Sequence, residues 1–432
     1  MSAYRETLSF LYSHLPMYQR VGSVAFKKGL GNTRALLESL GQPHLQYPCI
    51  HIAGTNGKGT VSHMLAACLT AAGFRTGLYI SPHYRDFRER IRIDGKMVPK
   101  RDVVEFVTQL RPVIEMVRPS FFEMTVAMAF DAFARHDVDI AVIETGLGGR
   151  LDSTNVIKPL LSVITNISFD HMAMLGNTLP KIGYEKAGII KKNTPVVIGE
   201  YQSKVAPVFK SVSKQRKAPI TFANRKLHAE LVHDSLNEQI YNVSDRKGLV
   251  FYERLRIGCA GPFQSANLIT SLQALHVLGQ VSGTYALTEV QIRKGFGDIR
   301  ALSGYQGRWQ VLGKNPLILA DSAHNPGGLS IILDRIRTFA HPQKHFVIGF
   351  VNDKDLDSVL GLFPADASYY FCRPNIPRGL ETVQLKAIAE MYSLEGQIYS
   401  SVRKALNAAR RAAKRTDFIF VGGSTFVVAE VI

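Results

Sequence analysis

The stretch His51-Ile-Ala-Gly-Thr-Asn-Gly-Lys-Gly-Thr60 decides the fold of the first part of the chain. The apolar run over residues 50–53 is typical of the end of a buried strand, and residues 61–71 carry apolar side chains at helical spacing. Between them lies a turn rich in glycine. A strand, such a turn and a helix form an architecture that binds phosphate, because glycines let backbone N–H groups approach the oxygens and the helix N-terminus adds partial positive charge.

The match of this turn to the common P-loop is imperfect. Gly59 separates Lys58 from Thr60, whereas the usual motif has Ser or Thr directly after the lysine. A Gly-rich turn can also join a strand to a helix without binding a ligand. The lysine and the strand–helix context favour a nucleotide phosphate site, in which Lys58 neutralises the outer phosphates and Thr55 or Thr60 reaches a magnesium ion or a phosphate.

Buried apolar runs and helical patterns alternate beyond this turn. The expected strands cover residues 75–80, 139–144, 161–165 and 194–198, and the expected helices cover residues 99–117, 121–135 and 179–190. Near-continuous apolar runs are typical of central strands in a parallel sheet. The alternation predicts an α/β domain with a doubly wound, mostly parallel sheet of P-loop type.

The remaining segments have other patterns. Residues 1–47 read as helices with a break at 29–31, residues 85–92 as a charged loop, residues 200–260 as a small antiparallel insertion, and residues 297–307 as a linker between domains. After the linker, strands over 317–320, 345–350 and 418–421 and a helix over 327–339 predict a second, smaller α/β domain. We expect the two domains to cover residues 1–299 and 300–432.

The composition limits the classes of protein to which this chain can belong. The chain has 432 residues, of which 46% are hydrophobic and 20% charged, and this is typical of a globular protein of two or three domains. Its apolar runs are too short to span a bilayer, and the N-terminus does not have the pattern of a signal peptide. The four cysteines are scattered, which fits neither a disulfide framework nor a zinc site. We therefore expect a cytoplasmic protein that does not bind membranes.

The net charge of +17 raises the question of nucleic acid. The basic residues are spread over 85–101, 204–226 and 403–415, and the last of these segments predicts an amphipathic helix with a solvated basic face. Aromatic residues do not alternate with these segments as they do in nucleic-acid platforms. An acidic small-molecule substrate together with ATP accounts for the sign of the charge, and a nucleic-acid-associated P-loop protein is the alternative.

Three polar residues follow expected strands of the first domain. They are Ser81, Glu144 and His171. Magnesium prefers hard oxygen ligands and bridges carboxylate to phosphate, so Glu144 and Ser81 suit a magnesium site, whereas an imidazole suits it less well. The alternatives are a solvent-facing carboxylate at Glu144 and a capping or loop histidine at His171.

A polar turn, Asp321-Ser-Ala-His-Asn-Pro326, follows a strand of the second domain. Asp321 is suited to hold a ribose or to orient a phosphate contact, and His324 to bind an anion or a substrate carboxylate. A simple helix N-cap is the alternative, since that needs only Asp or Asn. Arg308, directly after the linker, is placed to reach between the domains.

Several motifs together resemble those of one family. They occur in the order found in folylpolyglutamate synthases, which are ATP-dependent amide-forming enzymes of the Mur ligase superfamily: G-T-N-G-K-G-T, S-P-H, E-T-G-L-G-G-R-L-D-S-T-N, D-H…L-G-N-T…E-K-A-G-I-I, Q-S-A-N, G-R-W and D-S-A-H-N-P. The resemblance runs from about Leu15 to Ser424. It implies a Mur ligase central domain that binds ATP and folate, followed by a glutamate ligase domain.

The resemblance also implies roles for individual residues. Those implied in ATP binding are Gly57, Lys58, Gly59, Thr60, Asn267, Arg308 and Asp321, and those implied as magnesium ligands are Ser81, Glu144 and His171. Lys186 matches a lysine that is carbamylated in the family, where the added carboxylate helps to organise a second magnesium ion. The residues implied in contact with substrate are Ser120, Phe121, Phe122, Leu151, Asp152, Ser153 and Ser424. Lys58, Lys186 and His324 are the expected catalytic residues.

The activity that the resemblance implies is ligation of L-glutamate through an acyl phosphate. Dihydropteroate and folates are the expected acceptors, with ATP as co-substrate. Folylpolyglutamate synthesis alone is the first alternative, and another Mur-type ligase, such as one acting on cell-wall precursors, is the second. A non-catalytic nucleotide-binding module is a third. We expect small-molecule partners only, and a monomer.

Overall fold

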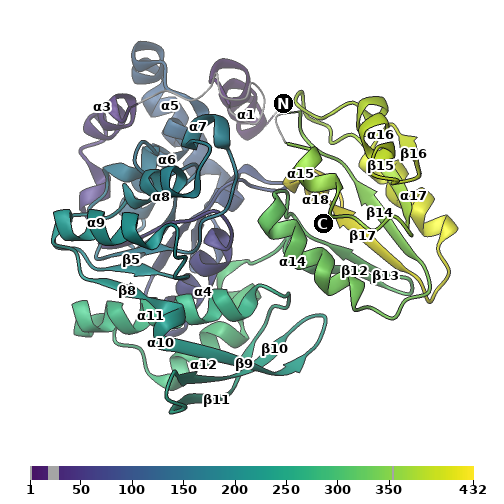
Figure 1. The fold of residues 1–432 in the computed structure, drawn as a ribbon. Coiled ribbons are helices and arrows are strands. Elements are labelled where there is room, and N and C mark those ends of the chain that lie inside the picture. Colours follow the sequence, from purple (N-terminus) through teal and green to yellow (C-terminus); the bar gives the residue numbers. More distant parts are fainter. Residues whose placement is uncertain (1, 18–28, 353–354) are drawn as a thin grey trace.

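The computed structural model describes residues 2–17, 29–352 and 355–432, and it has two lobes (Figure 1). The larger lobe runs from α1 (Ala3–His14) to α13 (Ile299–Ser303). The smaller lobe runs from β12 (Gln310–Lys314) to α18 (Thr425–Ala429). This is the α/β architecture with a smaller C-terminal part that the alternation of patterns predicts.

An eight-stranded sheet forms the centre of the larger lobe. Its strands lie in the order β4 (Lys96–Met97), β3 (Ile91–Ile93), β2 (Thr76–Tyr79), β5 (Ile140–Glu144), β1 (Cys49–Ala53), β6 (Leu161–Ile164), β7 (Val196–Ile198) and β8 (Ile220–Phe222). The six strands from β2 to β8 in this order pair in parallel, and β3 and β4 add an antiparallel edge. Because β1, β5 and β6 are buried along their whole length, their sequences are mostly apolar, with His51, Glu144 and Ser162 as the polar exceptions.

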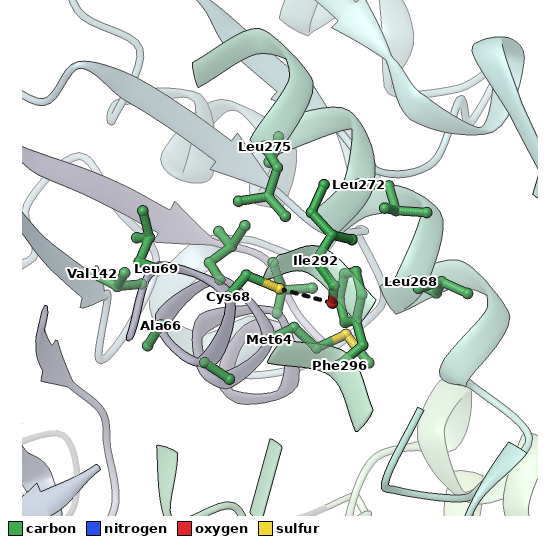
Figure 2. Packing of buried hydrophobic residues seen from close by; sticks show 14 of the residues in the cluster. Met64, Ala66, Cys68, Leu69, Val142, Leu268, Leu272, Leu275, Ile292 and Phe296 are labelled. Atoms are coloured by element: carbon green, nitrogen blue, oxygen red, sulfur yellow. Dashed lines mark hydrogen bonds between the residues drawn. The ribbon is translucent and has the colours of Figure 1, made fainter. Parts of the chain in front are cut away.

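Helices cover both faces of this sheet. One face carries α4 (Lys58–Ala71), α11 (Gln264–Val281), α12 (Glu289–Gly297) and α13, whose apolar side chains share one core with β1, β5 and β6. Figure 2 shows this core, in which Met64 and Cys68 of α4 lie against Leu272 of α11 and Phe296 of α12. This packing leaves the start of α4 at the carboxyl ends of the strands, where ligands bind in open α/β sheets.

The opposite face is covered by helices from earlier in the chain and from the β6–β8 region. They are α1, α3 (Gly31–Ser39), α5 (Lys100–Val117), α6 (Phe121–Arg135), α8 (Leu179–Ala187) and α9 (Ala206–Arg216). Two short helices, α7 (Met172–Leu175) and α10 (Ala223–Lys226), complete the lobe. The sheet is thus the middle layer of three.

A three-stranded antiparallel sheet confirms the expected insertion. It consists of β11 (Val250–Ile257), β10 (Gln239–Asp245) and β9 (Leu227–Asp234), and it continues the α11 side of the core. Only part of residues 200–260 belongs to it, because α9 and β8 come first.

The smaller lobe holds a six-stranded sheet. Its order is β12, β13 (Leu317–Ala320), β17 (Phe418–Gly422), β14 (Lys344–Ile348), β15 (Ser368–Cys372) and β16 (Gly396–Tyr399), with only β12 antiparallel. Its helices are α14 (Pro326–Arg337), α15 (Asp357–Leu360), α16 (Thr382–Glu390), α17 (Val402–Ala412) and α18. In α17 the basic residues are exposed and Val402, Ala405, Leu406 and Ala409 are buried, which confirms the predicted amphipathic helix.

Two local expectations are wrong. The segment 85–92 is not an irregular charged loop, because Asp86 and Glu89 form a capping box around a 3-10 helix, Phe87–Arg90, that leads into β3. The expected linker 297–307 is irregular only in part, because α13 occupies its middle and packs against α4. Of the helical segment 1–47, α1 and α3 are observed, and residues 18–28 lie outside the described residues.

The two lobes also touch on the side of the three-stranded sheet. Leu236, in the turn between β9 and β10, packs against the core of the smaller lobe, and Asp234 forms an ion pair with Arg335 of α14. Trp309 is buried at the junction of the lobes, with its ring edge-on to that of Phe339. Within the described ranges, none of the helices combines the length and apolar character needed to cross a membrane.

Candidate active site

The glycine-rich turn over residues 54–57 connects β1 to α4, as its sequence predicts, and with the first residues of α4 (58–60) it is here called the phosphate loop. Two of its glycines are required by their surroundings. A Cβ atom on Gly54 (φ 148°) would lie 1.9 Å from Thr165 Oγ1, and a Cβ atom on Gly57 (φ 84°) would lie 2.4 Å from Asn267 Oδ1. Only glycine combines this backbone conformation with so close an approach. The loop is therefore fixed between the end of β6 and the start of α11.

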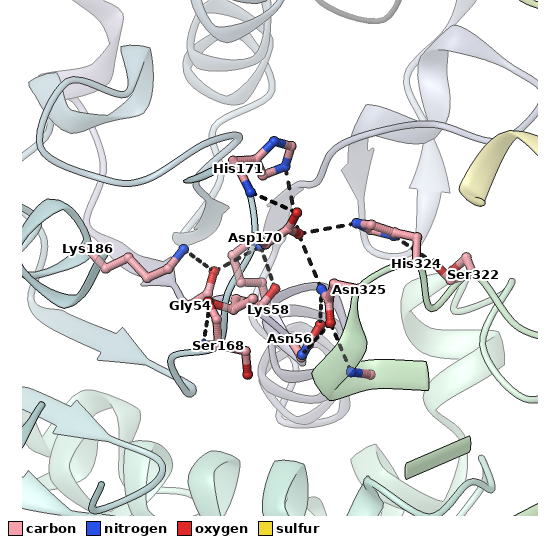
Figure 3. A network of polar contacts seen from close by, with 12 residues as sticks. Gly54, Asn56, Lys58, Ser168, Asp170, His171, Lys186, Ser322, His324 and Asn325 are labelled. Atoms are coloured by element: carbon pink, nitrogen blue, oxygen red, sulfur yellow. Dashed lines mark hydrogen bonds and ion pairs between the residues drawn. The ribbon is translucent and has the colours of Figure 1, made fainter. Parts of the chain in front are cut away.

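Two lysines, the half-buried Lys58 and the buried Lys186, meet at one carbonyl of this loop. Lys58 Nζ donates to Gly54 O at 3.0 Å and to Thr55 O at 3.2 Å, and Lys186 Nζ donates to the same Gly54 O at 2.7 Å (Figure 3). Burial lowers the pKa of Lys58, and the carboxylates of Glu144 and Asp170 oppose this shift. Burial and the charge of Lys58 lower the pKa of Lys186 to about 7.

Glu144 and Ser81 come together at the ends of β5 and β2. The buried carboxylate of Glu144 accepts a hydrogen bond from Ser81 N at 3.1 Å, and a Cβ atom on Gly59 would lie 3.8 Å from its oxygens. Burial raises the pKa of Glu144, while the charge of Lys58 lowers it. Glu144 thus faces the phosphate loop, and its alternative as a solvent-facing strand end is wrong.

Two of the three expected magnesium ligands, Ser81 and Glu144, fit that ion in their chemistry, whereas the imidazole of His171 suits it less well. His171 occupies the position before α7 in the left-handed conformation (φ 50°), its side chain makes no capping hydrogen bond, and it lines a cavity together with Ser81. Among the described residues, no group of three or more His, Cys, Asp or Glu residues could hold a metal by itself. Magnesium usually keeps several waters and one or two carboxylates beside substrate phosphates, so one carboxylate and a serine hydroxyl at a phosphate loop suit it.

The residues expected to contact the nucleotide come from both lobes. Asn267 lies against Gly57. The buried carboxylate of Asp321 accepts hydrogen bonds from Trp309 N at 2.7 Å and Ala323 N at 2.8 Å. Burial raises the pKa of Asp321, and the guanidinium of Arg308 opposes this shift. Thr60 is also buried, and its hydroxyl lies 3.4 Å from Tyr305 OH.

One cavity of about 220 Å³ gathers all seven residues that the resemblance implies in substrate contact. Ser120, Phe121, Phe122, Leu151, Asp152 and Ser153 line it from the larger lobe, and Ser424 lines it from the smaller lobe. Ser81, His171 and His324 also line it. These residues come from segments far apart in the sequence, and their position on one wall supports the prediction of a substrate site.

Asp170 is a site residue that the sequence reasoning missed. Its carboxylate, 11% exposed, lies 3.3 Å from His324 Nε2 and accepts a hydrogen bond from Asn325 Nδ2 at 3.2 Å (Figure 3). Asn56 and Asn325 were missed as well, although their amides join the two lobes. An acid directly before the expected ligand His171 was the one signal that sequence offered for Asp170.

This fold and this site define a two-lobed α/β protein with a phosphate loop and a cavity at the edge between its lobes. The Mur ligase middle domain model matches residues 52–275, and the model of the Mur ligase glutamate ligase domain matches residues 307–425. The chain therefore belongs to the Mur ligase family, within its branch of folylpolyglutamate and dihydrofolate synthases, which the following relatives represent.

A dihydrofolate synthase/folylpolyglutamate synthase of Bacillus subtilis is 31% identical over 83% of this chain and 82% of its own length. A probable bifunctional folylpolyglutamate synthase/dihydropteroate synthase of Haloferax volcanii is 31% identical over 99% of this chain, and this chain spans about half, 50%, of its length. The solved structure of Escherichia coli FolC in complex with DHPP and ADP superposes with a TM-score of 0.83 at 28% identity, over 100% of this chain and 97% of the FolC chain.

Proposed function

We propose that this chain is an ATP-dependent ligase that joins L-glutamate to dihydropteroate and to folates through an acyl phosphate. The observation that carries the proposal is the cavity: its walls combine the residues expected to bind the acceptor with His324 and Ser424 of the smaller lobe, and they include Ser81, whose N–H donates to Glu144. The names of the relatives support the same activity, and the FolC complex with DHPP and ADP supports small-molecule substrates of this kind.

In the first step, an oxygen of the acceptor carboxylate attacks the γ-phosphorus of ATP, and ADP leaves. Lys58 stabilises the charge of the transferring phosphoryl group, and for this its Nζ exchanges the carbonyls of Gly54 and Thr55 for phosphate oxygens. Gly57, Gly59 and Thr60 hold the phosphates, and Asn267, Arg308 and Asp321 hold the remainder of the nucleotide. Magnesium would be held by Ser81, Glu144 and His171 and would supply further charge neutralisation on the phosphates.

In the second step, the amine of L-glutamate attacks the carbonyl carbon of the acyl phosphate. The new C–N bond forms, the C–O bond to phosphate breaks, and inorganic phosphate leaves with the proton that the nitrogen loses. His324 and Ser424 orient the incoming glutamate from the smaller lobe. Since both steps take place between the two lobes, their closure keeps water from the acyl phosphate.

Lys186 has a distinct role in this proposal. Its buried amine, with a pKa of about 7, is suited to react with CO₂, because the neutral form is the nucleophile. The carbamate would carry negative charge beside the phosphate loop and would help to hold a second magnesium ion. We propose Lys186 as a carbamylated residue on this ground.

Product analysis with two acceptors tests the proposal. The purified protein is incubated with Mg²⁺, ATP and L-glutamate, and with dihydropteroate or a reduced folate as acceptor. The expected result is dihydrofolate from the first acceptor and a γ-glutamyl folate from the second, each with one ADP per bond formed. Products from the folate alone would reduce the function to folylpolyglutamate synthesis. An absence of product from both acceptors would contradict the proposal.

The same reaction mixture also tests whether nucleic acid takes part in the reaction. We propose that the enzyme acts as a cytoplasmic monomer on small molecules, without nucleic acid or a membrane. The basic residues support this, because in α17 they are spread over a solvent-facing helix surface. ADP formation that requires glutamate and acceptor, and that is unchanged by added DNA or RNA, is the expected result. Stimulation by nucleic acid would contradict it.

A further inference from the structure

The two lobes are joined at the phosphate loop by a pair of side-chain amides. Asn56 Nδ2 donates to Asn325 Oδ1 at 3.2 Å, and Asn325 Nδ2 donates to Asn56 Oδ1 at 3.0 Å. Asn325 Nδ2 also donates to Asp170 Oδ2 at 3.2 Å, and His324 Nε2 lies 3.3 Å from the same oxygen. We call Asn56, Asp170, His324 and Asn325 the interlobe clasp. Figure 3 shows its members around one point between the lobes.

Each side of the clasp is held on a rigid element. The backbone of Asn56 is fixed at the end of β6, since its N–H donates to Asn166 Oδ1 at 3.0 Å and its carbonyl accepts from Thr165 Oγ1 at 2.5 Å. On the other side, Asn325 is the N-cap of α14, because its Oδ1 accepts from Gly328 N at 2.9 Å. The buried amide of Asn325 thus has both donor hydrogens and both acceptor positions in use.

These contacts place a cavity residue relative to the phosphate loop. His324 lines the cavity and directly precedes Asn325. Its ring is held at both nitrogens, with Nδ1 at 3.0 Å from Ser322 O and Nε2 facing Asp170. A shift of the smaller lobe would therefore break the amide pair and move His324 from the cavity wall at the same time.

We propose that the clasp is a positioning device that keeps His324 in register with the phosphate loop, so that the acyl phosphate forms and reacts in one closed space. The inference rests on the proposed ligase activity. Asn56, Asp170 and Asn325 are positioning residues here, and His324 is the residue that they position. Without the clasp, ATP still reaches the phosphate loop, but the acyl phosphate is exposed to water before glutamate reacts with it.

The matched variants are chosen to separate the clasp from helix capping. Asn325→Ser keeps an N-cap for α14 but removes the amide that reaches Asn56 and Asp170. Asn56→Ala removes the other half of the pair, and Asp170→Asn is a third variant for the case that one of these does not fold. Arg335→Gln is the control, because it breaks a different contact between the lobes, the ion pair with Asp234, which lies outside the cavity wall.

The assay measures ADP and ligated glutamate in the same reaction. For the clasp variants we expect several ADP molecules per bond formed and a KM for glutamate raised about tenfold, with the KM for ATP nearly unchanged. The Asn56→Ala/Asn325→Ser double variant is expected to lose no more activity than the more impaired of the two single variants, because the two residues share one contact. Arg335→Gln is expected to keep one ADP per bond.

In the ligation assay, the proposal would be overturned by clasp variants that keep one ADP per bond, or by single-variant losses of activity that multiply in the double variant. Small-angle X-ray scattering with Mg²⁺ and a non-hydrolysable ATP analogue is independent of ligation. We expect a larger radius of gyration for the clasp variants than for the wild type, and equal radii would also count against the clasp. If the wild type ligates neither acceptor while the radii differ as expected, the proposed function fails and the interlobe contact stands.

Discussion

Lys58 and Lys186 share the carbonyl of Gly54, and two amines this close, one half-buried and one buried, are stable only if their charges are reduced or compensated. We propose that the phosphates of bound ATP compensate the positive charge of Lys58. We therefore expect Lys58→Ala to lower the ligation rate by at least about a hundredfold, because the charge that stabilises phosphoryl transfer is lost. Radiometric glutamate incorporation measures this effect. Lys192→Ala, at an exposed lysine, is the control. Wild-type turnover in Lys58→Ala would contradict the assignment of Lys58 to phosphoryl transfer.

For Lys186 we propose that carbamylation, a covalent modification, removes the positive charge of the amine. With a pKa lowered to about 7, the amine is mostly neutral above that pH and mostly protonated below it. Only the neutral amine reacts with CO₂, so activity is expected to fall as the pH drops through 7 and to rise with added bicarbonate. Isotopically labelled bicarbonate should give a carbamate signal in the NMR spectrum of the wild type that Lys186→Ala lacks. Full activity without such a signal would exclude the carbamate.

Glu144 is the carboxylate we assign to magnesium. Glu144→Gln keeps the shape of the side chain and an acceptor for Ser81 N, but it removes the charge that the metal needs. We expect the Mg²⁺ concentration for half-maximal rate to rise by about tenfold or more. A titration of the rate with Mg²⁺ checks this, and removal of the ion with a chelator should stop ligation in the wild type. An unchanged titration curve would remove Glu144 from the metal site.

At the scale of elements, α4 is held by the tight approach of α12. A Cβ atom on Gly295 of α12 would lie 2.4 Å from the Cα atom of Cys68 in α4. Although alanine is the better helix former, Gly295→Ala is therefore expected to lower the free energy of unfolding by about 1–3 kcal/mol through overpacking. Urea unfolding measures this change. Gly283→Ala is the matched control, because a Cβ atom there meets nothing within 4 Å.

The elements that sequence predicts best are those whose pattern depends only on burial. The strands β1, β5, β6 and β13 lie within a residue or two of their expected positions, because an apolar run buried on both faces has one interpretation. The segment 85–92 was misjudged, because Arg90 is buried, with its guanidinium donating to His83 Nδ1 and lying over the ring of Phe121. Charged residues in a sequence suggest solvent, and such partners become visible only in the structure.

The residues of the candidate site also fall into those that sequence predicts and those that it misses. Lys58, Glu144 and the residues of the cavity wall lie within motifs or at strand ends, and a parallel sheet brings strand ends to one edge. Asn56, Asp170 and Asn325 act through hydrogen bonds between the lobes. Their partners depend on how one lobe is placed against the other, and local sequence patterns do not contain that information.

At the scale of the whole molecule, the turn between β9 and β10 ties the larger lobe to the smaller one. Leu236 in this turn is half-buried against the core of the smaller lobe. We expect Leu236→Ala to lower the stability by about 1–2 kcal/mol, because apolar surface between the lobes is lost. Differential scanning calorimetry checks this, and the transition of the smaller lobe should separate toward lower temperature. A single transition at the wild-type temperature would show that this contact does not couple the lobes.

Trp309 is the one tryptophan of the chain, and it is buried where the chain passes from one lobe to the other. Its ring lies 6.1 Å from that of Phe339, centroid to centroid. Indole emission responds to the polarity and packing around the ring, so this protein carries its own optical probe at its junction. Stopped-flow fluorescence of the unlabelled enzyme would then time the movement of the lobes after mixing with nucleotide, glutamate or acceptor, and it would order these steps against the release of ADP.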